Sequence, residues 1–234
     1  MSLWAILKED FAVVLQKDPA IASKIELFFN YPGLLAIIHY RFAHALHRRG
    51  WKVLARIIMG FTQFITNIDI HPAAIIKRRV FIDHGIGVVI GETAEVHDDV
   101  TIYQGVSLGG VSLEKTKRHP TIYEGAVIGA GAKILGNITI GKNAKIGANS
   151  VVIRSVPDDS TAVGIPAKVI TKGRDKNPYD LGKIPDINRQ LFNFLIKRIE
   201  NIESQLEKEG HHHLLEECEE LKHLYAAYLS SLKS

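Results

Sequence analysis

Aliphatic residues recur at every sixth position through the middle third of the chain. The first three are Ile70, Ile76 and Ile82. After a shift of two residues the pattern resumes, and it resumes again after a longer interruption: Ile90, Val96, Ile102, Leu108, then Ile122, Ile128, Ile134, Ile140, Ile146 and Val152. A helix repeats near 3.6 residues and a strand at two. A period of six therefore indicates the hexapeptide repeat of a parallel β-helix.

Small or β-branched residues lie four positions after most of these aliphatic residues: Ala74, Val80, Ala94, Val100, Val106, Ala126, Ala132, Ala144 and Ser150. One hexapeptide cannot bury its apolar face alone, so three repeats should close a triangular coil and successive coils should stack about 4.8 Å apart. The alternative is an ordinary parallel sheet with helical crossovers. Residues 82–108 and 122–156 leave no room for those helices.

The segments on either side of this repeat have helical patterns. Within residues 1–68, an N-terminal helical domain, one apolar stripe is formed by Leu3, Trp4, Leu7, Phe11, Val14 and Leu15. Asp18 before Pro19 predicts the start of a second helix, and two more are expected over residues 34–49 and 52–66. Residues 187–234 form a C-terminal helical extension, in which Leu191, Leu195, Ile199, Ile202 and Leu206 have coiled-coil spacing.

We therefore expect an α+β chain in four parts. The helical domain is followed by a β-helix domain over residues 69–172, a linker over residues 173–186 and the helical extension. A polar loop over residues 109–121 interrupts the β-helix.

Composition removes several classes of function. No apolar run approaches the roughly 20 residues of a membrane span, and the N-terminus has no signal-peptide pattern. The single cysteine, Cys218, allows no intrachain disulfide and fits a reducing cytoplasm. The net charge is only +4 and the basic residues are scattered, whereas nucleic-acid binding favours a concentrated stripe. We expect a cytoplasmic protein. Binding of a small anionic ligand is still possible.

Polar residues replace apolar ones at a few positions of the repeat, and two of these suggest chemistry. Asp69 and His84 lie fifteen residues apart, where a coil takes about eighteen. We expect their side chains to approach each other on neighbouring coils. A carboxylate beside an imidazole is the arrangement of a general base and the group that orients it.

Several motifs resemble the serine O-acetyltransferase family over about residues 18–172. They are Asp69-Ile-His-Pro-Ala-Ala, Ile82-Asp-His-Gly, Gly91-Glu-Thr-Ala, Tyr103-Gln-Gly-Val-Ser-Leu-Gly-Gly, Arg118-His-Pro and Ile128-Gly-Ala-Gly-Ala-Lys-Ile-Leu-Gly-Asn. The resemblance implies a left-handed β-helix, although the general crossover rule would favour a right-handed one. It also implies transfer of an acetyl group from acetyl-CoA to the L-serine hydroxyl in cysteine biosynthesis, with His84 as general base and Asp69 as its orienting carboxylate.

The resemblance places the substrate-binding residues at Asp18, Asp83, Arg118 and His119. Two carboxylates suit the ammonium of serine, and an arginine fork with a histidine suits its carboxylate. The alternative to substrate binding is a structural role, in which Asp18 is only a helix cap and His119 is only part of a loop. The co-substrate acetyl-CoA is expected in a groove between subunits at the small residues Gly110, Ala130 and Ala148, with no metal.

The resemblance also implies partners. We expect a homotrimer or a dimer of trimers, and L-cysteine as a feedback inhibitor at the serine site, where the segment 168–182 could move. The N-terminal part is short, and long relatives use the missing part to join trimers. Those relatives also end in an isoleucine that enters O-acetylserine sulfhydrylase. This chain ends in Ser234, so that complex is not expected, and the coiled-coil seam suggests self-association.

Three other functions are possible on sequence alone. A hexapeptide acetyltransferase that acts on a sugar or nucleotide sugar would not need two carboxylates and an arginine around one small site. A zinc hydratase of the γ carbonic anhydrase type would need a close pair of histidines and a third, and His84, His97 and His119 lack that spacing. A non-catalytic scaffold would not need the pair Asp69 and His84.

Overall fold

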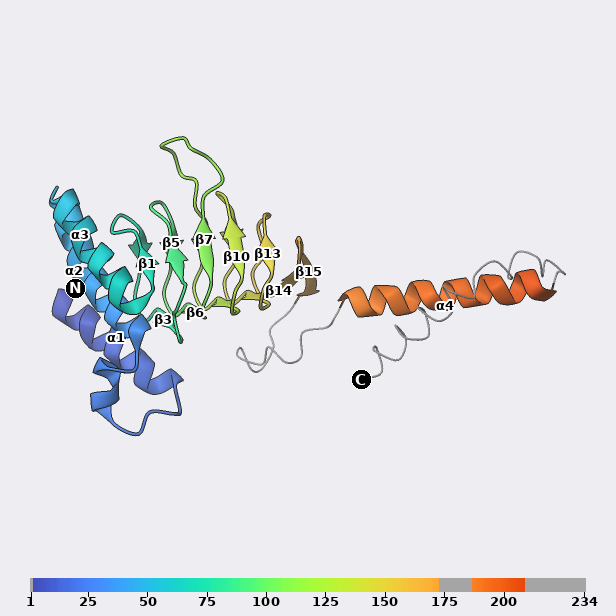
Figure 1. Cartoon of the computed structure of the whole chain (residues 1–234), viewed down its shortest axis with the longest axis horizontal. Helices are drawn as coiled ribbons and strands as arrows, with labels where there is room; N and C mark the ends of the chain where they lie inside the picture. The colour runs from blue at the N-terminus through green and yellow to red at the C-terminus, as the bar shows by residue number, and fades with distance from the viewer. Residues whose placement is uncertain (1, 173–186, 209–234) are drawn as a thin grey trace. The chain divides into compact units, whose positions relative to one another are not determined.

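The computed structural model describes residues 2–172 and 187–208 (Figure 1). The chain divides into two compact units, Met1–Ile184 and Pro185–Ser234. The expected linker over residues 173–186 and the part of the helical extension over residues 209–234 lie outside the described residues. None of the helices within the described ranges is both long and apolar enough to cross a membrane.

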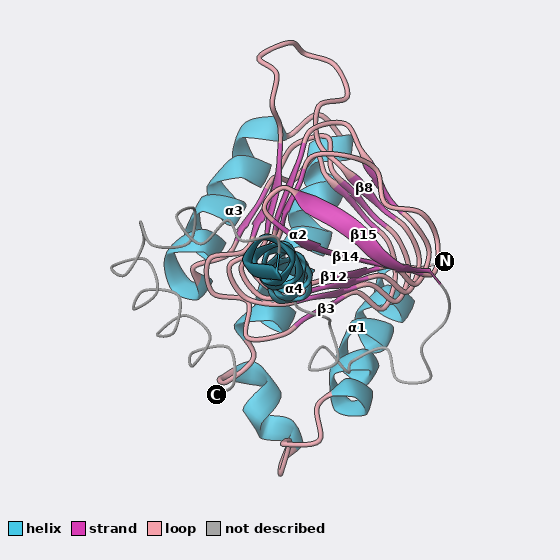
Figure 2. Ribbon diagram, turned by 90° about the vertical axis from the view of Figure 1, so that its right-hand side faces the viewer, coloured by secondary structure: helices cyan, strands magenta, loops and turns pink. Residues whose placement is uncertain are grey.

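The middle of the chain is a left-handed parallel β-helix, which Figure 2 shows along its axis as a stack of triangular coils. Most of its strands contain two or three residues: β1 (Asp69–Ile70), β2 (Ile75–Ile76), β3 (Phe81–Ile82), β4 (Val89–Ile90), β5 (Glu95–Val96), β6 (Thr101–Ile102), β7 (Ser107–Gly109), β8 (Thr121–Ile122), β9 (Val127–Ile128), β10 (Lys133–Leu135), β11 (Thr139–Ile140), β12 (Lys145–Ile146), β13 (Val151–Val152), β14 (Ser160–Gly164) and β15 (Ala167–Lys172).

Three sheets make the three sides of the prism. Sheet A has the order β1-β4-β7-β10-β13, sheet B β11-β8-β5-β2, and sheet C β15-β14-β12-β9-β6-β3. The six-residue period predicted this arrangement, because every aliphatic position of the repeat from Ile70 to Val152 points into the prism and is no more than 6% exposed. The small residues four positions later are equally buried.

Two of the three corners of the prism matter for the site. The C–A corner joins each strand of sheet C to the next strand of sheet A, at residues 83–88, 103–106, 129–132 and 147–150. The A–B corner joins sheet A to sheet B, at residues 71–74, 91–94, 110–120 and 136–138. The expected loop lies at the A–B corner, where it projects away from the coils (Figure 1).

Helices cover the N-terminal end of the prism: α1 (Leu3–Lys17), the 3₁₀ helix η1 (Lys24–Phe28), α2 (Pro32–Arg48) and α3 (Lys52–Thr66). No coil precedes the first coil, so the backbone groups on its outer edge lack strand partners. Side chains of α2 supply hydrogen-bond partners for them. The Tyr40 hydroxyl donates to the Ala74 carbonyl at 2.6 Å and accepts from the Ile76 amide. Arg41 donates to the carbonyls of Ile76 and Lys77. An otherwise open sheet edge is thereby closed.

A buried ion pair completes this contact. Arg41 donates to both oxygens of Asp10, at 2.9 and 3.0 Å, and both side chains are almost fully buried. The expected apolar stripe of the first helix is therefore partly wrong. Asp10 and Val13 face the core, whereas Trp4 is 69% exposed. Hydrophobicity alone could not place a carboxylate there, because its partner lies 31 residues away.

The start of a second helix at Asp18 is also wrong. Asp18 is instead the residue at which α1 ends, and its amide donates to the Val14 carbonyl. The next helical segment is the short η1, which begins after Ser23. The two later helices lie where the sequence predicted them, α2 within two residues and α3 over the same residues.

The C-terminal end of the β-helix is closed differently. Strand β15 pairs antiparallel with β14, so the last coil ends in a hairpin in place of another parallel strand. In the second compact unit, α4 (Ile187–Lys208) is a separate helix. Its residues Leu191, Leu195, Ile199 and Ile202 are exposed and keep the coiled-coil spacing.

Candidate active site

His84 lies at the C–A corner of the first coil, two residues after the end of β3. Its φ of 57° is in the left-handed region, which residues other than glycine seldom adopt. The side chain is 77% exposed, and Nε2 lies 3.9 Å from the nearer oxygen of Asp83. The turn thus holds an accessible imidazole beside a carboxylate, at some cost in backbone strain.

Two more polar groups reach this corner from the helical segment. Asp18 ends α1, and its second carboxylate oxygen accepts a hydrogen bond from the Tyr31 hydroxyl at 2.7 Å. Its other oxygen accepts from the Ala20 amide. The charges of Asp18, Asp83 and His84 influence one another, which places all three at one site. Asp18 is therefore held by Tyr31 and does not start a helix.

The two carboxylates differ in how readily they ionise. The Tyr31 hydrogen bond, and then the Ala20 amide, lower the pKa of Asp18. Burial raises the pKa of Asp83, and the nearby charge of Asp18 raises it further, whereas His84 opposes the shift. Tyr31 itself stays protonated, because burial and its bond to Asp18 raise its pKa to about 12. A cation between the two carboxylates would relieve their mutual repulsion.

Asp69 lies at the start of β1, next to Val89 in the register of sheet A. It therefore stands at the edge of the same C–A corner as His84, which the chain reaches again after nearly one circuit of the prism. Among the described residues no hydrogen bond or ion pair joins Asp69 to His84. The fifteen-residue spacing placed the two residues at one corner, but the free chain does not bring their side chains into hydrogen-bond contact.

Arg118 and His119 lie at the other corner, A–B, at the end of the projecting loop. Arg118 donates to Glu92 at 2.6 Å and to the Glu114 carbonyl at 3.2 Å. The bond to Arg118 lowers the pKa of Glu92, with smaller effects from the neighbouring His71 and His119. Lys117 donates to Glu95 and to the Thr93 carbonyl. The loop end is thus a cationic segment bound to the second coil.

The His119 ring packs against two glycines of this corner. A Cβ on Gly91 would lie 2.1 Å from Nε2 of His119, and one on Gly110 would lie 3.2 Å from the same atom. A side chain at Gly91 would overlap the ring, and one at Gly110 would crowd it. Burial lowers the pKa of His119, as do the charges of Arg118 and Lys117, whereas Glu92 raises it. The imidazole is therefore neutral at pH 7.

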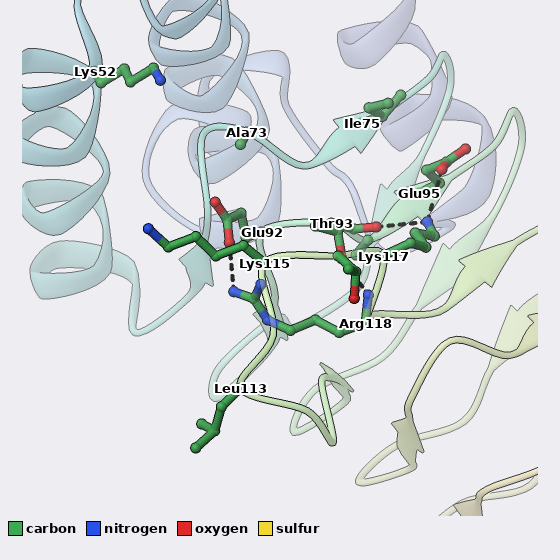
Figure 3. A pocket seen from close by; sticks show the side chains of 12 residues that line it. Lys52, Ala73, Ile75, Glu92, Thr93, Glu95, Leu113, Lys115, Lys117 and Arg118 are labelled. Carbon is green, nitrogen blue, oxygen red and sulfur yellow. Dashed lines mark hydrogen bonds and ion pairs between the residues drawn. The ribbon is translucent and has the colours of Figure 1, made fainter.

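A pocket of about 800 Å³ opens beside this corner (Figure 3). Its lining includes Lys52 of α3, Glu92, Thr93, Lys117 and Arg118, and Figure 3 shows the ion pairs of Arg118 and Lys117 along its wall. His84 does not line it. The cationic and the acidic halves of the expected site therefore lie at different corners of one chain.

The small residues expected to bind the co-substrate divide in the same way. Gly110 lies at the A–B corner and is exposed. Ala130 and Ala148 lie at the C–A corner, where Ala148 is exposed and Ala130 is half-buried. A ligand that touched all three would have to bridge two corners.

Sequence reasoning missed two polar residues at these corners. Nothing in the spacing indicates that Tyr31 bonds to Asp18, thirteen residues away. Thr93 belongs to a motif that was noticed, but its contacts with Arg118 and His119 depend on how the loop returns to the second coil. Within residues 2–172 and 187–208, no three His, Cys, Asp or Glu side chains group as metal ligands do.

Comparisons with known proteins agree with this architecture. The family model "Bacterial transferase hexapeptide (six repeats)" matches residues 119–154. A serine acetyltransferase of Bacillus pumilus (strain SAFR-032) is 51% identical over 203 residues, which are 86% of this chain and 94% of the relative. A serine acetyltransferase of Helicobacter pylori (strain ATCC 700392 / 26695) is 56% identical over 161 residues, which are 69% of this chain and 94% of the relative.

Solved structures give the same result. A serine acetyltransferase in complex with cysteine matches with a TM-score of 0.74 and 41% identity, over 78% of this chain and 72% of the other. The soybean serine acetyltransferase in complex with serine matches with a TM-score of 0.70 and 43% identity, over 72% of this chain and 70% of the other.

Proposed function

The chain belongs to the serine acetyltransferase family, and we propose that its two polar corners together bind L-serine and promote its acetylation by acetyl-CoA. The reaction is a serine O-acetyltransferase reaction that yields O-acetylserine for cysteine biosynthesis. One observation supports the assignment of sites most strongly. Carboxylates and a histidine gather at one corner, and an arginine and a histidine gather at another. These are the opposite charges that the two ends of a zwitterion need.

Each end of serine has a matching group of residues. The ammonium suits the space between Asp18 and Asp83, where two carboxylates repel each other in the free chain. The carboxylate suits Arg118, whose planar guanidinium can donate two parallel hydrogen bonds, with His119 beside it. Glu92 holds Arg118 in place meanwhile.

The proposed chemistry proceeds through His84. Its imidazole takes the proton of the serine hydroxyl while the oxygen attacks the thioester carbon of acetyl-CoA. The C–S bond then breaks, and the departing thiolate takes the proton from His84, which yields O-acetylserine and CoA. Asp69 is the carboxylate that we propose to orient His84 and stabilise its imidazolium. Catalytic hydrogen bonds are often long before substrate binds.

Acetyl-CoA is the proposed ligand of the small residues at both corners, Gly110, Ala130 and Ala148. Small side chains allow a thin pantetheine chain to approach the main chain. Because these residues divide between the A–B and the C–A corner, a ligand that contacted all three on one chain would have to bridge two corners. The groove is therefore proposed to lie between neighbouring subunits.

The same division supports a homotrimer or a dimer of trimers. In a closed three-fold ring, the C–A corner of each subunit meets the A–B corner of the next, and three equal sites result. Light scattering of the active protein tests the assembly. We expect the mass of three or six chains, and an active monomer at assay concentration would contradict the shared site.

L-Cysteine is the proposed feedback inhibitor at the serine site. It presents the same ammonium and carboxylate as serine, with a thiol in place of the hydroxyl, and one solved relative is a complex with cysteine. Inhibition should therefore be competitive with serine. The segment 168–182, which could move with cysteine, lies largely outside the described residues.

The function itself is tested by CoA release with L-serine present and absent. We expect release that depends on serine, and little with galactosides or amino sugars at the same concentration. Faster release with a sugar acceptor than with serine would contradict the proposal.

A further inference from the structure

Thr93 contacts the end of the projecting loop through its hydroxyl, its amide and its carbonyl. Its hydroxyl oxygen lies 3.1 Å from the amide nitrogens of both Arg118 and His119. It also lies 2.9 Å from Nδ1 of the His119 ring. The Thr93 amide donates to the same Nδ1 at 3.2 Å, and the Thr93 carbonyl accepts from Lys117. One residue thus holds the whole segment from Lys117 to His119.

The number of donors and acceptors fixes where the protons lie. A threonine hydroxyl has one proton and two lone pairs. Both lone pairs are used, because the amides of Arg118 and His119 donate to the oxygen. The hydroxyl proton must then point to Nδ1 of His119. The Thr93 amide can only donate, so Nδ1 accepts from two donors and has no proton of its own.

A neutral imidazole without a proton on Nδ1 must have one on Nε2. Among the described residues, no side chain or backbone group bonds to Nε2. No buried side-chain nitrogen or oxygen in that part of the chain lacks a partner, so Nε2 is at least partly exposed to solvent. It lies at the edge of the ring next to Gly91 and Gly110. His119 therefore presents one hydrogen-bond donor at the A–B corner.

We propose that Thr93 is a positioning residue for the amino-acid substrate: its hydroxyl and amide fix His119 as the Nε2–H tautomer, so that His119 donates to the substrate carboxylate beside Arg118. This inference rests on the proposed function for the identity of the ligand. The arrangement of protons rests only on the geometry of Thr93 and His119.

The charged and titratable groups around His119 agree with a neutral ring. Arg118 and Lys117 disfavour a second proton, and Glu92 favours one less strongly than burial opposes it. Protonation of Nδ1 would also set an N–H against the Thr93 amide. Removal of the Thr93 hydroxyl should therefore make His119 easier to protonate and allow the other tautomer.

The experiment measures the tautomer directly. Two-bond ¹H–¹⁵N spectra of the full-length protein with ¹⁵N-labelled histidine distinguish protonated from unprotonated ring nitrogens, and His119→Asn identifies the signals of His119. We expect Nδ1 without a proton and Nε2 with one at neutral pH, in the protein without ligand. A His119 ring with its proton on Nδ1, or a doubly protonated ring, would overturn the proposal without any variant.

Two variants then separate positioning from folding. Thr93→Val keeps the shape and removes the hydroxyl, whereas Thr93→Ser keeps it. We expect Thr93→Val to raise the KM for serine about three- to tenfold, the effect of one neutral hydrogen bond, with the KM for acetyl-CoA nearly unchanged and the pKa of His119 higher. Thr93→Ser should restore both. A Thr93→Val protein with the wild-type tautomer and serine KM would overturn the proposal.

The spectra need no turnover, so the two proposals fail separately. If the chain does not acetylate serine, the tautomer of His119 is still measured. If it acetylates serine while Nδ1 carries the proton, the role of Thr93 is wrong and the proposed function stands.

Discussion

At the C–A corner, individual residues place an accessible imidazole beside two carboxylates, which is the arrangement that the proposed proton transfer needs. His84 combines a left-handed backbone with a largely exposed side chain, and Asp18 and Asp83 supply negative charge beside it. A buried histidine could reach a substrate only after a conformational change. His84 is exposed, so a ligand bound at this corner can contact it directly. The roles assigned to His84 and Asp69 can be tested singly.

We expect His84→Ala to lower kcat by about 10²- to 10⁴-fold, which is the usual contribution of general acid–base catalysis. Asp69→Asn should lower kcat with a smaller effect on KM. Steady-state kinetics measure both. His97→Ala is the matched control, because His97 stacks on Tyr123 between sheets B and C, away from both corners. A near-wild-type kcat for His84→Ala would show that another group is the base.

At the A–B corner, we expect Arg118→Lys to raise the KM for serine about ten- to hundredfold and to leave the KM for acetyl-CoA nearly unchanged. A charge-assisted hydrogen bond contributes about 1.5–3 kcal/mol, and lysine cannot reproduce the planar fork. Inhibition by cysteine should weaken as well, because cysteine presents the same carboxylate. Arg79→Lys, at an ion pair with Asp99, is the control. Equal loss for both substrates would mean that Arg118 supports the groove or the fold.

At the scale of elements, the repeat was predictable because its cause is local. Each aliphatic position from Ile70 to Val152 must enter the prism, and all of them do. The helix boundaries of α2 and α3 follow equally local signals. The failures concern contacts over long distances in the chain. Asp10 occupies a core position only because Arg41 pairs with it, and Asp18 ends a helix in place of starting one.

The same limit applies to the site. Spacing placed Asp69 and His84 at one corner, and the motifs placed Arg118 and His119 at the end of one loop. Spacing could not show that the corners differ, because this depends on which side of the triangle each turn follows. Nor could it show the bonds of Tyr31 and Thr93, which are made across thirteen or more residues.

The contact between helix α2 and the first coil makes a prediction about stability. Arg41→Met leaves Asp10 buried without its partner and two carbonyls without donors, and breaking a buried pair in this way costs about 3–5 kcal/mol. Urea unfolding measures the loss. Arg78→Met is the matched control, because its pair with Glu9 is far more exposed, with side chains 42% and 27% exposed, and exposed pairs contribute about 0–1 kcal/mol. Equal effects of the two variants would contradict the role of the buried pair.

For the whole molecule, stability should fall as the pH drops below about 6.5. Burial lowers the pKa of His39, His44, His71 and His119 from their ordinary value of 6.5. The unfolded chain therefore binds more protons than the folded chain between 6.5 and the lowered values, and stability rises with pH in that window. The raised pKa values of Asp10 and Asp83 make stability fall as the pH rises. This effect begins at their lower ordinary value of 3.8.

Melting temperature measured from pH 8 to pH 5 tests this expectation. His39→Gln removes one of the four groups, and burial is the cause of its lowered pKa, so the variant should show a shallower decline. A melting temperature that rises toward pH 5 would mean that the histidines gain protons more readily in the folded chain.

The assembly of subunits decides whether the site is complete, since the acidic corner of one subunit and the cationic corner of the next are proposed to form each site. His84→Ala disables one corner and Arg118→Ala the other, so each variant alone should be nearly inactive. If the two are mixed in equal amounts, unfolded and refolded together, about one site in four combines two intact corners when subunits assemble at random. We expect recovery of about a quarter of wild-type serine-dependent CoA release, and none when the two are mixed without unfolding. No recovery in mixed trimers that contain both chains would show that one chain builds the whole site.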